Sequence, residues 1–406
     1  MQKTSSIFCN QGEKFFSLVL FLFLLGECLC QGHIFPESYF KTEKILSLEV
    51  DCTDYPFYNS ERITVINDSI ALSTTFMSIH KNHIRLNQIN LFNSTSPLVS
   101  ITLNIPKIGK RYVNNNIHDI LYHNDTLYIL TAGLLWVFDK NYKFLKQLKI
   151  SRKWDTLDVM STGQLLLSYY YNYHPNTSKK DFEIALYSKE GKEEKIIAPN
   201  PDQINFGYIN RHHLVTTDGY NIIRGSLSNP KLYLYDAGLE IKDSLNLEIP
   251  YAQYLGPVLD SSLLSLELFQ NQFKDLKLTK FHDLKWCGGN KYLLGYYLSY
   301  NCYGYSVILI ENNKLVQTEN IIQDAGQFWD FDIPGNENHT FTNEDISFIN
   351  QMESGRFFKN KFYSIQSGTY SSPEGKTWRD YYDMKQSVSP EGKCYMYLVV
   401  SELTIP

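Results

Sequence analysis

Hydrophobic and polar residues alternate along this chain in short runs, and the order of the runs repeats. In the clearest copy, polar turns such as Asn124-Asp125 separate four apolar strands. These strands are expected at residues 117–120, 126–130, 134–141 and 144–148. A second copy of the same order is found at residues 281–284, 291–295, 305–313 and 315–318. Alternation broken by Asn, Asp and Gly predicts antiparallel hairpins, so the copies predict one repeated four-stranded unit.

Units of this kind follow one another along most of the chain, at a period of roughly 40 to 50 residues. Further units are expected at residues 62–105, 155–198 and 205–249, and a last unit begins near residue 345. A four-stranded antiparallel unit repeated at this period predicts a β-propeller, which is a ring of radial blades. The predicted fold class is therefore all-β.

The number of blades depends on residues 254–281, a segment long enough for about three strands. If it forms a unit of its own the ring has seven blades, and if it belongs to a neighbouring unit the ring has six. The last unit, with strands at 361–366 and 393–400, is short of a full set. We expect the lone alternating strand at 45–50 to join this unit and close the ring, because unpaired strand edges are a liability.

Composition supports a large folded core and excludes one class of partner. The chain has 406 residues, of which 43% are hydrophobic and 15% aromatic, including 30 tyrosines. Such a load of aromatic residues is typical of many half-buried strands. The formal net charge of -5 provides no global basic field, so nucleic acid is not expected as a partner.

Residues 1–31 are interpreted as a signal peptide, and residues 32–406 as a single propeller domain. The apolar run from Phe15 to Leu25 is too short to span a bilayer and suits the core of an export signal. The expected location is outside the cytoplasm: periplasmic, at the cell surface, or secreted. An alternative is a lipoprotein signal in which Cys28 carries a lipid, and membrane contact is expected only through that lipid.

Four cysteines remain after the signal, an even number that fits an oxidising compartment. All four are disulfide candidates: Cys287 and Cys302 flank one predicted hairpin, whereas Cys52 follows the first strand and Cys394 opens the last one. If those two strands are neighbours, a Cys52–Cys394 disulfide would clamp the ring by roughly a few kcal/mol. The alternative is four buried free thiols.

One recurring phrase resembles a known group of proteins. It runs over residues 124–129 and continues with Trp136-Val137-Phe138-Asp139-Lys140. On an exported chain of this size, it resembles the bacterial six-bladed β-propeller proteins of TolB-like or NHL-like architecture. The resemblance implies a disc of blades around a central channel and favours six blades over seven. It implies no active site, because the group includes binding modules, peptide-handling scaffolds, lyases and lactonases.

Sequence motifs of common enzymes are absent. The chain contains no G-x-S-x-G, no phosphate-binding loop, no H-E-x-x-H and no C-x-x-C. No metal site and no cofactor are therefore expected. Calcium remains an alternative, because propeller lactonases are similar in architecture and collect its ligands from several blades.

Two equivalent pairs are the candidates for catalytic chemistry: His118 with Asp119, and His282 with Asp283. A ring of such groups could bind a cation or hold an acid-base pair. Because side chains alternate along a strand, each pair is expected to point apart, one side chain toward the next blade and one near the channel. The alternative is that His and Asp fix the blade edge through hydrogen bonds to the backbone.

Two insertions are the candidates for recognition. The segment that follows residues 361–366 is long for a compact fold, and a second insertion runs over residues 328–341. Together they supply flat aromatic faces and a cationic fork that suit a sugar ring or a protein partner. The candidate binding residues are Trp378, Arg379, Tyr381, Tyr382 and Trp329. The alternative is that these aromatic residues cover the last blade.

The sequence supports two hypotheses about function. The first is an exported propeller, not an enzyme, that acts as a binding or scaffold protein for a protein or a carbohydrate. The second is a propeller hydrolase or lyase, metal-dependent in one version, with its active site at the channel mouth.

Overall fold

A computed structural model of the chain describes seventeen stretches, and the account that follows is limited to them. They are residues 40–50, 62–74, 79–80, 82–92, 95–97, 99–107, 117–131, 133–150, 154–168, 184–197, 214–225, 230–249, 280–299, 302–324, 355–366, 370–371 and 393–403. Within these stretches the regular elements are all β-strands. A search of the same residues for a helix long and apolar enough to cross a membrane finds none.

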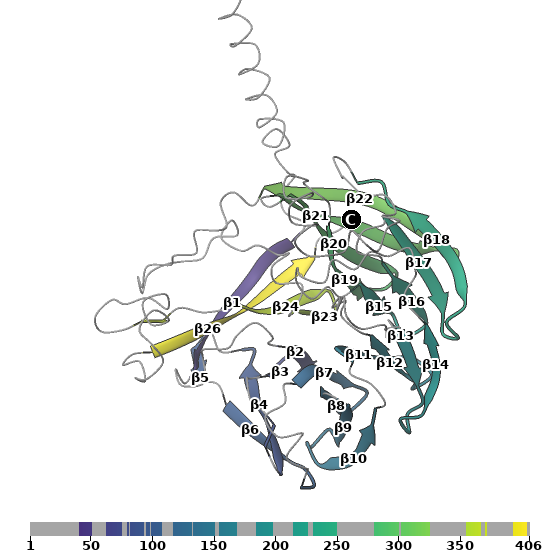
Figure 1. Cartoon of the computed structure of the whole chain (residues 1–406). Coiled ribbons are helices and arrows are strands. Elements are labelled where there is room, and N and C mark those ends of the chain that lie inside the picture. Colours follow the sequence, from purple (N-terminus) through teal and green to yellow (C-terminus); the bar gives the residue numbers. More distant parts are fainter. Residues whose placement is uncertain are drawn as a thin grey trace, which may run out of the picture.

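Six antiparallel sheets are arranged in a ring, so the protein is a six-bladed β-propeller (Figure 1). Blade 1 contains β2 (Ile63–Asn67), β3 (Ile70–Ser73), β4 (His83–Asn90) and β6 (Val99–Asn104). Blade 2 contains β7 (Ile117–His123), β8 (Thr126–Thr131), β9 (Leu134–Asp139) and β10 (Phe144–Lys149). Blade 3 contains β11 (Thr156–Val159), β12 (Leu165–Ser168), β13 (Ile184–Tyr187) and β14 (Glu193–Ile197).

The next two blades follow the same plan. Blade 4 contains β15 (Val215–Thr217), β16 (Asn221–Arg224), β17 (Lys231–Asp236) and β18 (Ile241–Asn246). Blade 5 contains β19 (Lys280–Gly288), β20 (Lys291–Ser299), β21 (Cys302–Glu311) and β22 (Lys314–Asp324). Most of the segment that left the blade number open in the sequence, residues 254–279, lies outside the described residues. The six sheets nevertheless decide the number in favour of six.

Blade 6 is built from both ends of the chain. Its strands are β23 (Arg356–Phe358), β24 (Lys361–Gln366), β26 (Lys393–Leu403) and β1 (Phe40–Val50), with β25 (Tyr370–Ser371) beside β26. β1 pairs with β26 from Phe40 opposite Leu403 to Val50 opposite Cys394. A short parallel contact then joins β1 to β5 (Thr95–Pro97). The predicted closure of the ring by an N-terminal strand is confirmed.

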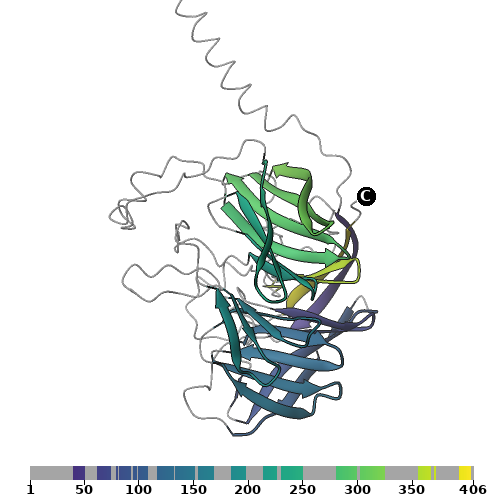
Figure 2. The same ribbon diagram turned by 90° about the vertical axis from the view of Figure 1, so that its right-hand side faces the viewer.

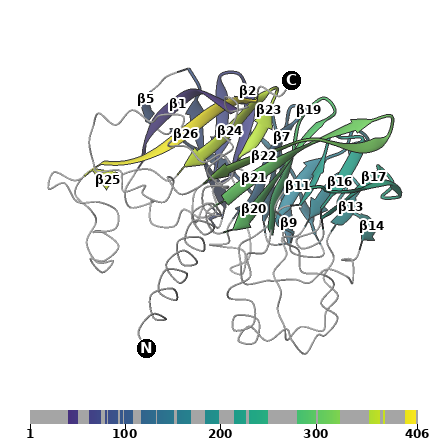
Figure 3. The same ribbon diagram turned by 90° about the horizontal axis from the view of Figure 1, so that it is seen from above.

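This closure is visible from three sides. The purple β1 lies beside the yellow β26 in Figure 1 and again in the views turned by 90° in Figures 2 and 3. The two strands are more than 340 residues apart in the sequence. Their pairing therefore joins the beginning of the propeller to its end.

Turn residues explain why the strands end where they do. Asn124 and Asp125 both have positive φ angles, 47° and 58°, and so do Asn312 and Asn313, 51° and 61°. Two consecutive residues of this kind form the hairpin turn whose twist matches that of the flanking strands. Asn and Asp tolerate this conformation better than other residues that carry a side chain. The same dipeptides that marked the repeat in the sequence therefore fix the register of two hairpins.

The core consists of layers between neighbouring blades. In β9, Trp136 and Phe138 pack with blade 1, whereas Leu135 and Val137 pack with blade 3. The edge-on ring of Phe144 lies against Phe138, with 6.0 Å between the ring centroids. Because successive side chains of a strand point to opposite faces, a strand between two blades must be apolar at every position. This explains the continuous apolar run at residues 134–138.

The closing strand is part of such a layer, which makes its contribution measurable. Leu48 of β1 is 1% exposed and belongs to a cluster that joins blade 6 to blade 1. We expect Leu48→Ala to lower the free energy of unfolding by about 2–5 kcal/mol in urea denaturation, because it leaves a cavity in that layer. Leu145→Ala is the control, because Leu145 is 53% exposed on β10 and its loss should cost less than about 0.5 kcal/mol. Equal effects of the two substitutions would contradict a closing role for β1.

Candidate functional site

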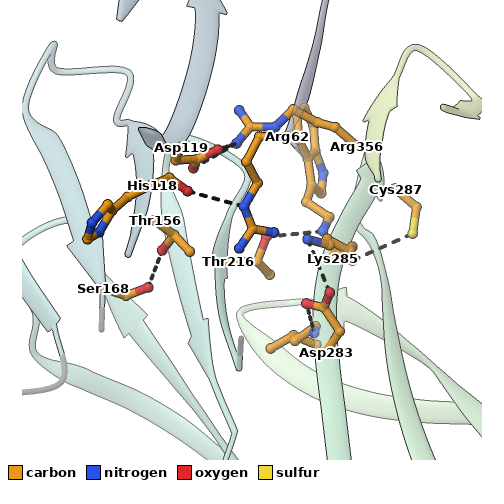
Figure 4. A network of polar contacts seen from close by, with 12 residues as sticks. Arg62, His118, Asp119, Thr156, Ser168, Thr216, Asp283, Lys285, Cys287 and Arg356 are labelled. Atoms are coloured by element: carbon orange, nitrogen blue, oxygen red, sulfur yellow. Dashed lines mark hydrogen bonds and ion pairs between the residues drawn. The ribbon is translucent and has the colours of Figure 1, made fainter. Parts of the chain in front are cut away.

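The axis of the propeller is lined by polar and charged residues from the innermost strands. Blade 1 contributes Arg62 and Thr64, blade 2 contributes Asp119, blade 3 contributes Asp158, blade 4 contributes Thr216, blade 5 contributes Asp283 and Lys285, and blade 6 contributes Arg356. Figure 4 shows most of these side chains directed toward one central region. Every blade therefore contributes to this axial cluster, which contains three cationic side chains and three carboxyl groups.

The carboxylate of Asp119 contacts residues of three blades. Its Oδ1 accepts the N–H of Ile120 at 2.9 Å, and its Oδ2 accepts the N–H of Leu157 in blade 3 at 2.9 Å. Arg356 Nη2 donates to both oxygens, at 3.1 and 3.0 Å. Asp119 is 4% exposed, so these charge-assisted bonds lie away from bulk water. One carboxylate thus connects blades 2, 3 and 6.

Asp283 occupies the equivalent place in blade 5. Its Oδ1 accepts the N–H of the next residue, Leu284, at 2.8 Å, as Asp119 does with Ile120. Lys285 Nζ lies 3.2 Å from Asp283 Oδ2, and the carboxylate itself is fully buried. The two aspartates that the repeat placed in equivalent positions are therefore equivalent in their local bonding as well.

A β-bulge lies at the histidine of each His-Asp pair. The register of β7 with β8 shifts between Ile117 and Asp119, which makes His118 a β-bulge, and β19 has the same shift at His282. His118 Nδ1 lies 2.7 Å from the carbonyl of Trp154 and 3.3 Å from Asp155 Oδ1. His118 contacts the segment that enters blade 3, whereas Asp119 contacts both that segment and Arg356 at the axis. That the two side chains point apart stays a prediction, because a bulge breaks the simple alternation of side chains along a strand.

The position of the second histidine is described only in part. His282 is the bulged residue of β19, but its side chain lies outside the described residues. The two histidines are thus equivalent in the register of their backbones. For His118, the contacts support the alternative in which the pair fixes the blade edge through hydrogen bonds to the backbone.

Threonines perform the same task between two other pairs of blades. Thr64 Oγ1 accepts the N–H of Tyr122 at 2.9 Å, and Thr216 Oγ1 accepts the N–H of Trp286 at 3.1 Å. The inner edge of each blade has N–H groups without a neighbouring strand, and such groups need another acceptor. A side-chain oxygen of the preceding blade provides it, as Asp119 does for Leu157.

Sequence reasoning missed most of this cluster. Arg62, Asp158, Lys285 and Arg356 were not identified, because single charged residues in short strands carry no motif. Arg62 Nε donates to the carbonyl of His118 at 3.1 Å, a contact between residues 56 positions apart. An alignment of the innermost strands would have found Thr64 and Thr216, each of which directly follows a buried apolar residue. It would also have found Asp119 and Asp283, each of which is separated from such a residue by a bulged histidine.

Among the titratable groups of the axial cluster, Asp158 has the clearest shift in pKa. Burial raises its pKa from 3.8 to about 6, Arg356 and Lys285 oppose the rise, and Asp119 adds to it. The side chain is only partly exposed. A carboxyl group with such a pKa can take up and release a proton near neutral pH, which is a property of functional sites as well as of structural charge clusters.

The absence of a metal or cofactor, and calcium as the alternative, stay predictions. Among those residues, no group of three or more His, Cys, Asp or Glu side chains is arranged to hold a metal ion. Calcium binding therefore stays an alternative without a located site.

The hairpin cysteines do not form the disulfide for which they were candidates. Cys287 is a buried free thiol whose Sγ donates to the carbonyl of Lys285 at 3.6 Å, and burial raises its pKa. Cys287 lies at the Lys291 end of β20, whereas Cys302 pairs with Ser299 at the other end. Those ends are eight residues apart, which is about 26 Å along a strand. That distance is far beyond the reach of a disulfide.

The other disulfide stays a prediction. Cys52 and the side chain of Cys394 lie outside the described residues. The prediction that their strands are neighbours is confirmed, because Val50 of β1 pairs with Cys394 of β26.

The predicted binding residues also lie outside the described residues: Trp378, Arg379, Tyr381, Tyr382 and Trp329. The strands show where their segments attach. Residues 325–354 connect the end of β22 to the start of β23, and the segment with Trp378 connects β24 to β26. Neighbouring strands run antiparallel, so the end of β22 lies opposite the β21–β22 turn, and the end of β24 lies opposite the β23–β24 turn. Both segments therefore leave from the face opposite these turns. The strand ends from which the two insertions start therefore lie on one face of the disc, which we call the insertion face.

Comparison with known proteins supports the fold alone. No protein-family model matches the sequence, and the curated proteins give no match either. A member of the DUF4221 family from Bacteroides vulgatus is similar in structure, with a TM-score of 0.52 at 10% identity, covering 89% of this chain and 97% of that chain.

Two further solved structures have lower TM-scores and add no argument. A protein from Bacteroides fragilis, named as a candidate exported protein, has a TM-score of 0.49 at 10% identity, covering 90% of this chain and 96% of its own. Virginiamycin B lyase from Staphylococcus aureus has a TM-score of 0.37 at 9% identity, covering 89% of this chain and 100% of its own.

The contacts of Asp119 predict a large loss of stability when its carboxylate is removed. Asp119→Ala should lower the free energy of unfolding by about 3–5 kcal/mol, because Arg356 and the N–H of Leu157 lose their acceptor in a buried place. Asp68→Ala is the matched control, since Asp68 pairs with Lys359 at 2.6 Å where both side chains are more than 60% exposed. That change should cost less than about 1 kcal/mol. Urea denaturation of both variants measures the difference.

The pKa of Asp158 predicts how stability changes with pH. Folding raises this pKa, so the folded state binds the proton more tightly than the unfolded state and loses stability as pH rises from about 4 to about 6. Asp158→Asn cannot titrate and should lack this loss. At pH 7 it should be more stable than the native chain by up to about 3 kcal/mol, the free energy of a shift from 3.8 to about 6.

Thermal or urea denaturation between pH 4 and pH 7 measures this effect. Asp125→Asn makes the same chemical change in an exposed hairpin turn and is the control. If both variants follow the pH dependence of the native chain, burial of Asp158 does not govern its titration.

Proposed function

We propose that this chain is an exported β-propeller of TolB-like or NHL-like architecture that binds a protein or a carbohydrate and is not an enzyme. The observation that carries this proposal is the use of the candidate catalytic residues as connections between blades. Asp119 holds Arg356 and the N–H of Leu157, and His118 contacts the carbonyl of Trp154. Groups engaged in this way are poorly placed to serve as a general acid or base for a substrate.

The insertion face is the proposed binding surface. Both predicted recognition segments attach there, one after β22 and one after β24. Trp378, Tyr381 and Tyr382 offer flat apolar faces with polar tips, and Arg379 offers a planar cationic fork. Aromatic residues and arginine are the residues most enriched at binding hot spots. Their concentration on two segments of one face supports a partner at that face.

Export is part of the proposal. Residues 1–31 lie outside the described residues, and the support for a signal peptide is the apolar run from Phe15 to Leu25 behind a polar start. The proposed location is periplasmic, at the cell surface, or secreted. Lipid attachment at Cys28 is the version of the proposal in which the propeller stays bound to a membrane.

A propeller hydrolase or lyase is the second candidate function, and one observation favours it. Asp158 lies on the axis with a pKa raised to about 6 by burial, close to the range in which an acid-base catalyst works at neutral pH. Under this alternative Asp158, rather than His118, would exchange the proton.

Site-specific photocrosslinking tests the binding proposal. A photoreactive amino acid at Trp378 or Trp329 should trap one partner in cells that export the protein, whereas the same amino acid at exposed Leu145 on β10 should not. The partner identified in this way is then titrated against the purified native chain and Trp378→Ala. We expect at least a tenfold weaker Kd for the variant, the typical effect of losing a hot-spot tryptophan.

Two further results separate binding from catalysis. His118→Ala should lower the melting temperature while its Kd for the partner stays within about twofold of the native value, because His118 acts between blades. Conversion of the partner or glycan to product by the native chain, lost in Asp158→Asn, would support the hydrolase or lyase instead. Identical crosslinks from positions 378 and 145 would contradict the insertion face as binding surface.

A further inference from the structure

The balance of charges in the axial cluster depends on a single carboxyl group. Arg62, Lys285 and Arg356 provide three positive charges, and Asp119, Asp158 and Asp283 provide three negative charges when all are ionised. The cluster is then neutral. Protonation of Asp158 leaves it with a net charge of about +1, in surroundings where charges interact more strongly than in water.

The contacts of the six groups are not equivalent. Asp119 is paired with Arg356, and Asp283 is paired with Lys285. Arg356 and Lys285 are close enough to Asp158 to lower its pKa, and Asp119 is close enough to raise it. Asp119 comes from β7, Lys285 from β19 and Arg356 from β23, and neighbouring β15 contributes the uncharged Thr216. Asp158 is therefore the carboxyl group that a competing anion could replace at least cost.

Arg356 brings a buried hydrogen-bond donor to this place. Arg356 Nη1 is buried and has no hydrogen-bond partner among the residues that the structure describes. Lys285 Nζ forms an ion pair with Asp283 Oδ2 at 3.2 Å, and a lysine ammonium has three N–H donors. Buried donors without acceptors are costly, and a ligand oxygen that reaches them removes this cost.

Solvent reaches other atoms of the same side chains. The side chains of Arg356 and Lys285 are 23% and 16% exposed, and Asp158 is partly exposed. Figure 4 shows Arg62, Lys285 and Arg356 directed toward one central region from blades 1, 5 and 6. The exposed parts of these side chains are where a small ligand would meet the cations.

We propose that the propeller axis binds a small oxyanion, such as a carboxylate or phosphate group, between Arg356 and Lys285, and that ionised Asp158 competes with it. Arginine and lysine are the residues that recognise these groups, arginine through its planar fork and lysine through its compact charge. Binding at the axis does not depend on the partner proposed for the insertion face.

Competition by Asp158 gives the site a defined pH dependence. An anion binds the protein in which Asp158 is protonated, and this fraction falls as pH rises above about 6. Between pH 5 and pH 7.5 the apparent Kd should therefore increase about thirtyfold. Asp158→Asn removes the competing charge, so its Kd at pH 7.5 should equal that of the native chain at pH 5.

Isothermal titration with sulfate and with formate tests this, because neither anion titrates between pH 5 and pH 7.5. Sulfate represents a phosphate group and formate represents a carboxylate. The anion with the lower Kd therefore identifies the ligand class. Sodium chloride keeps the ionic strength constant and serves as the reference anion. We expect saturable binding at pH 5, binding about thirtyfold weaker at pH 7.5, and pH-independent binding by Asp158→Asn.

Two variants complete the test. Lys285→Met should abolish binding of either anion, whereas Lys359→Met, which removes an exposed lysine of the β23–β24 turn, should leave the Kd unchanged. If Lys285→Met fails to fold, Asp158→Asn still decides the question. Binding of sulfate and formate no tighter than chloride at pH 5, or an Asp158→Asn variant that binds no better than the native chain at pH 7.5, overturns the proposal.

Discussion

Antiparallel pairing between β1 and β26 is the interaction on which the rest of the propeller depends. Each blade buries its side chains against the blades on either side, so an open ring would expose two complete layers of apolar residues. The pairing of the first described strand with the last one removes both exposed edges. Leu46 and Leu48 of β1 then complete the layer between blades 6 and 1. The axis, with residues from all six blades, exists only because the ring is closed.

A second feature of the ring is the likeness of opposite blades. Blade 1 uses Thr64 and blade 4 uses Thr216 to accept an N–H of the following blade. Blade 2 and blade 5 both carry a bulged histidine followed by an aspartate that accepts the next N–H. In a ring of six, blades three positions apart lie opposite each other. The two copies visible in the sequence, blades 2 and 5, therefore lie opposite each other in the ring. The inner strands of blades 1 and 2 resemble those of blades 4 and 5.

The two halves differ where blades 3 and 6 contribute charge. Asp119 reaches Arg356 of blade 6, whereas Asp283 is paired with Lys285 of its own strand. Blade 3 contributes Asp158, whose pKa burial raises to about 6. Departures from a repeated structural pattern are the places where function is expected, because the repeat alone does not require them. The binding proposal for the axis uses this asymmetry. The proposal for the insertion face uses the segment between blades 5 and 6 and the segment between β24 and β26.

The sequence by itself determined the all-β architecture, the blade units and the closing strand. These follow from local causes: alternation with a period of two, apolar runs such as residues 134–138, and turn dipeptides such as Asn124-Asp125. It also placed Asp119 and Asp283 in equivalent positions. It could not determine what those residues contact, because Asp119 and Arg356 are 237 positions apart and a bulge at His118 interrupts the regular alternation of side chains along β7. Only the closed ring brought these groups together, because its geometry places six short strands around one axis.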